Sequence, residues 1–153
     1  MTDAHSVTAN DPLVVCSTMS DERSDVLFCT IIQMHYNDDT DPWELALCWA
    51  KMRRLHRGPG GRIKRRFDRL LAVLRHLTLR GLAMWVGGLV SSVLYSIAYM
   101  QLEDAHLVDQ LTAHVRQASV IGVMNAFELG WMLWSLAVLN HRDTATINCI
   151  VWR

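Results

Sequence analysis

Proline, glycine and paired cysteine motifs are all sparse in this sequence, and each shortage argues against a particular class of fold or site. Only three prolines and eight glycines occur among 153 residues, which is too few for the turn-rich chain of an all-β domain. The four cysteines (Cys16, Cys29, Cys48 and Cys149) form no Cys-x-x-Cys pair, which argues against a zinc site or a disulfide framework. We therefore expect an intracellular domain with reduced thiols and no bound metal.

An excess of charge of one sign is also missing, because fifteen basic and fifteen acidic side chains cancel. The charges are nevertheless unevenly spread: residues 53–80 contain ten Lys or Arg and a single acid, Asp68. Such a segment is most often a solvated helix surface, and Phe67 alone is too little aromatic content for a base-stacking platform. We expect no nucleic-acid partner.

Signatures of catalysis are lacking as well. The seven histidines show no His-Glu-x-x-His pattern, and the Gly58-Pro59-Gly60-Gly61 segment lacks the Lys-Ser/Thr pair of a phosphate-binding loop. The first twenty residues contain acids and no basic flank before an apolar run, unlike a secretory signal. We predict a protein that is neither an enzyme nor secreted and that uses no cofactor.

The sequence does contain a succession of helix signals, which predicts an all-α fold. Asp41, Pro42 and Glu44 supply an N-cap acid, a proline at the first helical position and an acid in the first turn, so a helix should run from there to Arg57. Apolar residues at four-three spacing predict an amphipathic helix over 62–80. Further helices are expected over 24–36, 103–117 and 120–139 within a domain spanning 23–142, between a tail at 1–22 and another at 143–153.

The 21 residues from Leu82 to Leu102 contain no charged side chain, and two interpretations compete for them. In the first they form a buried central helix, apolar all round because neighbouring helices surround it. In the second they pair with Ala118–Asn140 as a two-helix transmembrane hairpin, viroporin-like or part of a membrane complex, with Glu128 inside the membrane as an ion or proton site. The small residues of the run favour the buried helix.

Two tryptophan-glycine clusters, about forty-five residues apart, resemble the first and second homology motifs of the Bcl-2 family. The segment Leu77–Val90 is similar to the first motif, with Arg-Gly, a tryptophan, glycine and an aliphatic run in that order. The segment Glu128–Trp134 is similar to the second, and Leu107-Val108-Asp109 resembles a segment of the family's sixth helix. The order of these motifs carries the resemblance, which covers roughly residues 22–140.

The sequence also departs from the family pattern. An Arg that pairs with an Asp of the bound helix follows the Trp-Gly pair in the family, whereas Gly87 or Gly88 stands there in this chain. Arg80 is the candidate substitute. The third motif, expected near Leu47–Met52, lacks its Gly-Asp pair, and no apolar C-terminal anchor follows. These departures resemble those of viral family members.

The resemblance implies a Bcl-2-like helical bundle around a buried apolar central helix. Its function would be to inhibit apoptosis by sequestering the amphipathic death-motif (BH3) helix of pro-apoptotic partners such as Bim, Bak and Bax. It would act in the host cytoplasm or at the mitochondrial outer membrane, and whether it forms a homodimer stays open. The implied structural motif is Gly130, Trp131 and Trp134, and the implied ligand-helix groove contains Phe67, Leu70, Leu74, Leu77, Arg80, Trp85, Gly87 and Gly88.

Overall fold

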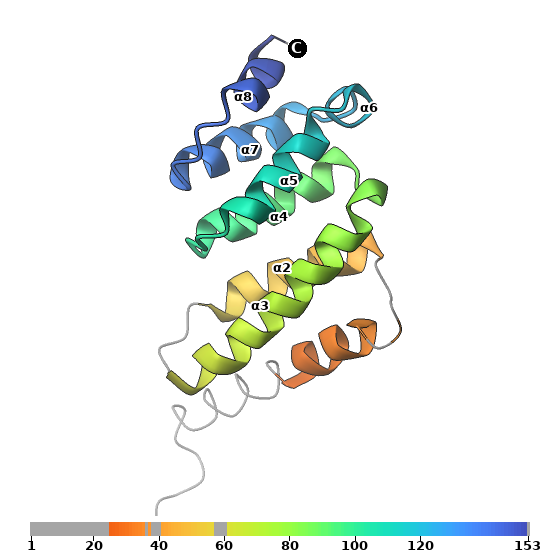
Figure 1. The fold of residues 1–153 in the computed structure, drawn as a ribbon, viewed down its shortest axis with the longest axis vertical. Helices are drawn as coiled ribbons and strands as arrows, with labels where there is room; N and C mark the ends of the chain where they lie inside the picture. Colours follow the sequence, from red (N-terminus) through yellow and green to blue (C-terminus); the bar gives the residue numbers. More distant parts are fainter. Residues whose placement is uncertain (1–24, 36, 38–40, 57–60, 153) are drawn as a thin grey trace, which may run out of the picture.

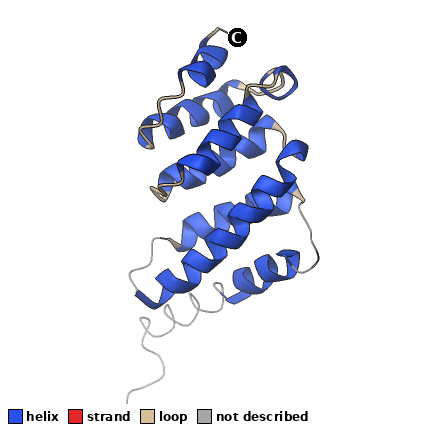
Figure 2. Ribbon diagram, viewed as in Figure 1, coloured by secondary structure: helices blue, strands red, loops and turns tan. Residues whose placement is uncertain are grey.

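All regular structure in the described part of the chain is helical, which confirms the all-α prediction (Figures 1 and 2). The computed structural model describes residues 25–35, 37, 41–56 and 61–152, so the predicted tail over 1–22 and the predicted helix end at Arg57 lie outside it. A helix over residues 25–35 comes first. It is followed by α2 (Pro42–Leu55), α3 (Gly61–Gly81), the 3-10 turn η1 (Leu82–Met84), α4 (Gly87–Tyr99), α5 (Ala105–Val115), α6 (Ala118–Ile121), α7 (Ala126–Val138) and α8 (Thr144–Val151).

Helix starts follow the capping signals in the sequence. The Asp41 carboxylate accepts a hydrogen bond from the Trp43 backbone N–H, and Pro42 occupies the first turn of α2 as predicted. Asp104 caps α5 in the same way, and Asp143 caps α8. Each cap satisfies a backbone N–H group that the first turn of a helix leaves without an intrahelical partner.

Helix α4 is the centre of the fold. It packs most extensively on α7 and then on α2, and its residues are buried except for one stripe. Next to it, α2 and α3 are joined by a buried hydrogen bond of 3.0 Å from the Trp49 indole N–H to the Thr78 hydroxyl. A buried apolar helix at the centre of a bundle therefore agrees with the sequence-based prediction, although the helix is shorter than expected.

The predicted continuous helix over 82–102 is interrupted near its beginning. Residues Trp85 and Val86 have extended backbone conformations and separate η1 from α4. The break turns the Trp85 carbonyl toward α5, where the buried His114 Nε2 lies 2.8 Å from it. A tertiary hydrogen bond thus replaces the intrahelical bonds that a continuous helix would have made here.

The second apolar run, predicted as one helix over 120–139, is likewise divided, into α6 and α7. The division falls at Asn125, whose side chain caps α7. The predicted tail over 143–153 differs as well, because α8 is a helix whose Thr146 and Ile150 are buried. Among the described residues, no helix combines the length and the hydropathy needed to cross a bilayer.

Candidate functional site: an aromatic face over the central helix

Most residues of the predicted ligand groove lie in the hydrophobic core. Leu74 and Leu77 are fully buried on α3. A partner helix could contact these side chains only after the helices that cover them had moved, so an open groove over α3 stays a prediction. The remaining apolar members are also buried: Phe67, Leu70 and Trp85.

The two glycines at the start of α4 make close contacts with the segment that begins α7. A Cβ atom at Gly87 would lie 2.2 Å from the Met124 Cγ, and one at Gly88 would lie 2.3 Å from the Glu128 Oε1. Such distances are far below van der Waals contact, so a side chain at Gly87 would have to displace the buried Met124, and one at Gly88 would displace the Glu128 carboxylate. The structure therefore brings the segments that resemble the first and second Bcl-2 motifs into direct contact.

Arg80, the candidate ligand-binding cation, is exposed in the last turn of α3. Gly130 lies on the exposed side of α7 with no atom within 4 Å of where its Cβ would be. The predicted motif residues Trp131 and Trp134 are not packed into the core, because 47% and 43% of their surface remains exposed. These two tryptophans belong to a surface that the sequence did not predict.

The accessible stripe of α4 forms the floor of this surface. Gly88, Ser92, Tyr95 and Tyr99 are half-buried, whereas every other residue of α4 is buried. Their spacing of four, three and four residues places them on one side of the helix. Helix α4 is therefore accessible to solvent only along this one stripe.

Helix α7 borders this stripe on one side with its tryptophans. The ring centroid of Tyr95 lies 5.6 Å from that of Trp131 and 5.0 Å from that of Trp134, with the rings tilted against each other. Since Gly88 approaches Glu128 while Tyr95 approaches Trp134, α4 and α7 run side by side in the same direction. We call Tyr95, Tyr99, Trp131 and Trp134 the aromatic face.

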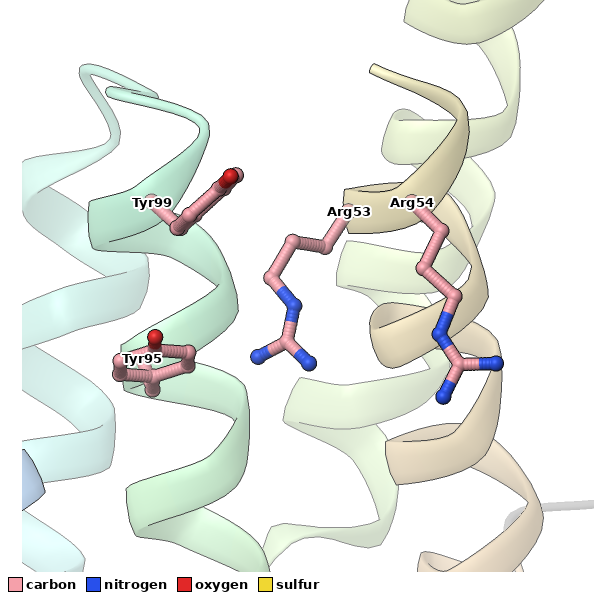
Figure 3. A pocket seen from close by; sticks show the side chains of 4 residues that line it. All are labelled: Arg53, Arg54, Tyr95 and Tyr99. Carbon is pink, nitrogen blue, oxygen red and sulfur yellow. The ribbon is translucent and has the colours of Figure 1, made fainter. Parts of the chain in front are cut away.

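Helix α2 borders the same stripe on the other side with two arginines (Figure 3). The Arg53 guanidinium carbon lies 4.8 Å above the Tyr95 ring centroid and 5.9 Å from that of Tyr99. Both distances fit cation–π contacts. Arg53, Arg54, Tyr95 and Tyr99 together line an open cleft between α2 and α4.

A carboxylate lies at the opposite end of the stripe, beside Gly88. Asn125 and Glu128 form a capping box at the start of α7: the Asn125 side chain accepts from the Glu128 N–H at 3.0 Å, and the Glu128 Oε2 accepts from the Asn125 N–H at 2.8 Å. Glu128 therefore sits at a helix N-terminus, where the helix dipole favours its negative charge. The Glu128 carboxylate thus stabilises the first turn of α7.

Sequence reasoning missed Tyr95, Tyr99 and Arg53 because it treated 82–102 as uniformly buried. The helical spacing of Gly88, Ser92, Tyr95 and Tyr99 was only a partial signal, because Gly87, Ser91 and Ser96 of the same run are equally small or polar and are buried. The pairing with Arg53 depends on how α2 packs against α4, which local sequence does not encode.

Within the described ranges, no three His, Cys, Asp or Glu side chains gather closely enough to hold a metal ion. No protein-family model, curated protein or solved structure matches this chain.

Proposed function

We propose that the protein binds an amphipathic helix of a partner protein on the aromatic face. The observation that carries the proposal is that the one accessible stripe of α4 places two tyrosines between two half-exposed tryptophans and an arginine. Tryptophan, tyrosine and arginine are the residues enriched among the energetic hot spots of protein interfaces. Exposed aromatic rings gathered at one place on a small domain mark an interaction surface.

We further propose that the partner is the death-motif helix of a pro-apoptotic protein and that the chain acts as a Bcl-2-like inhibitor of apoptosis. The contact of Gly87 and Gly88 with Met124 and Glu128 supports this proposal. Through this contact, the two segments that resemble the family's first and second motifs together form one end of the proposed binding surface. The order of the motifs along the chain supports it as well.

The physical mechanism is the burial of an apolar helix face. A partner helix presents side chains at i, i+3/i+4 and i+7, and these would pack along Tyr95 and the two tryptophans. Each fully buried aliphatic anchor contributes about 1.5–3 kcal/mol before the cost of association is subtracted. Holding the helix of a protein such as Bim, Bak or Bax would keep that helix from triggering mitochondrial permeabilisation.

Titration of labelled death-motif peptides against three variants tests the proposal. We expect Trp134→Ala and Tyr95→Ala each to weaken binding by roughly 2 kcal/mol, about 30-fold, because each removes a ring from the centre of the face. Trp152→Ala is the matched control, since Trp152, the C-cap residue of α8, is 84% exposed and is not a member of the face. It should leave the affinity unchanged.

Circular dichroism of each variant shows whether the fold survives the substitution. Wild-type protein that binds none of the peptides would contradict the proposed partner. Wild-type affinity in folded Trp134→Ala and Tyr95→Ala variants would contradict the proposed surface. It would favour the predicted groove over α3 instead.

A further inference from the structure

Opposite charges stand at the two ends of the α4 stripe. At the Tyr95–Tyr99 end, Arg53 and Arg54 of α2 line the cleft. At the Gly88 end, the Glu128 carboxylate lies against the start of α4. Gly88 precedes Tyr95 by seven residues and Tyr99 by eleven, so the charges are separated by about 10–16 Å along the helix axis.

The Glu128 carboxylate at the negative end is positioned by contacts with both α4 and the start of α7. The Glu128 Oε1 occupies the space that a Cβ at Gly88 would need, while its Oε2 is held by the Asn125 N–H. Gly88 therefore leaves room for the carboxylate beside α4, and the capping hydrogen bond holds it at the start of α7. Because it is half-buried, its charge is less screened by salt than that of a freely exposed group.

The positive end remains able to bind a carboxylate. The contact places the Arg53 guanidinium carbon 4.8 Å above the Tyr95 ring centroid, and a guanidinium has five N–H donors with which it can bind a carboxylate. An acid on the partner could therefore pair with Arg53 without breaking the cation–π contact.

We propose that these charges fix the direction in which a helix lies on the aromatic face. The proposal rests on the helix-binding function proposed above and adds the partner's charge pattern: an acid at its N-terminal part and a Lys or Arg two to three turns later, with the helix antiparallel to α4. The acid then meets Arg53, and the base meets Glu128. In this direction the partner's helix dipole opposes those of α4 and α7, and its own charges complement its dipole.

Two designed peptides of identical composition test the direction. Both are alanine-rich amphipathic helices with leucines at i, i+4, i+7 and i+11, and each has one Glu and one Lys, seven residues apart, beside the leucine stripe. One has the Glu first and the other the Lys first. We expect the Glu-first peptide to bind the wild-type protein roughly tenfold more tightly, with the ratio shrinking as ionic strength rises.

Charge variants then identify the residues responsible. Arg53→Glu should reduce the ratio to one or below, and Glu128→Gln, which keeps the shape of the cap, should reduce it by several-fold. Arg69→Glu is the matched control because it makes the same charge change at an exposed position of α3, outside the face. It should leave the ratio unchanged.

The outcomes separate the two proposals. Equal affinities for the two peptides, both lost in Trp134→Ala, would overturn the directional inference and retain helix binding on the aromatic face. A preference for the Glu-first peptide that survives Arg53→Glu would overturn the assignment of the positive end. Failure of the wild-type protein to bind either peptide would overturn both proposals.

Discussion

At the scale of single residues, the chain uses glycine in two distinct ways. Gly87 lies where α4 crosses close to Met124, with the Met124 Sδ only 2.7 Å and the Val120 carbonyl oxygen 3.2 Å from the position of an added Cβ. Gly130 lies on an exposed helix side with open space around it. The same substitution should therefore have opposite effects on stability at the two positions.

We expect Gly87→Ala to lower the free energy of unfolding by about 1–3 kcal/mol, because the buried Met124 and a backbone carbonyl would have to move. Gly130→Ala should raise it by roughly 0.5–1 kcal/mol, because alanine loses less backbone entropy in a helix than glycine. Urea unfolding monitored by circular dichroism measures both. A stabilising effect at Gly87 would contradict the close packing of α4 on the α6–α7 segment.

At the scale of helices, α8 is attached to α5 by a small polar network around Asp143. The Asp143 Oδ2 accepts hydrogen bonds from Arg116 at 2.7 Å and from the Thr146 hydroxyl at 2.6 Å. Burial alone would raise the pKa of Asp143, but the hydrogen bonds from Thr146 and Thr112 and the charge of Arg116 outweigh burial, so the pKa is lowered. The carboxylate form is thus the one that stabilises the folded protein.

A lowered pKa in the folded state predicts a loss of stability in acid. The contribution of Asp143 is fully present above the pKa of an unfolded aspartate, about 3.9, and is lost as pH falls from there through the lower pKa of the folded state. Between about pH 6 and about pH 3, the wild-type protein should therefore lose more unfolding free energy than Asp143→Asn. An equal loss of unfolding free energy in the two proteins would show that ionisation of Asp143 does not contribute to the stability of the fold.

The sequence predicted helices well where signals were local and poorly where they were tertiary. Periodicity located α3 to within one residue at each end, and the Asp41-Pro42 cap located the start of α2. The break at Trp85 was missed because the hydrogen bond that replaces the intrahelical bonds there comes from His114, 29 residues away. The aromatic face was missed for the same reason, since it exists only where α2 and α7 flank α4.

At the scale of the whole molecule, the core and the proposed binding surface are separate sets of residues. Leu74 is fully buried, whereas Trp134 is nearly half exposed. Leu74→Ala should lower the free energy of unfolding by about 2–5 kcal/mol, and the folded fraction should bind death-motif peptides with unchanged affinity. Parallel unfolding and titration measurements check this. A folded Leu74→Ala protein with weakened binding would place the partner helix over α3 instead.

The fluorescence of Trp131 and Trp134 should also report whether a helix is bound on the aromatic face. Half-exposed indoles emit at longer wavelengths than buried ones, and a helix laid across them would remove water from their rings. The background emission comes from Trp49 and Trp85, which are almost fully buried, and from the exposed Trp43 and Trp152, which are not members of the face. Binding at this surface should therefore shift the emission of the unlabelled protein toward the blue, and that shift should vanish in Trp134→Phe together with Trp131→Phe.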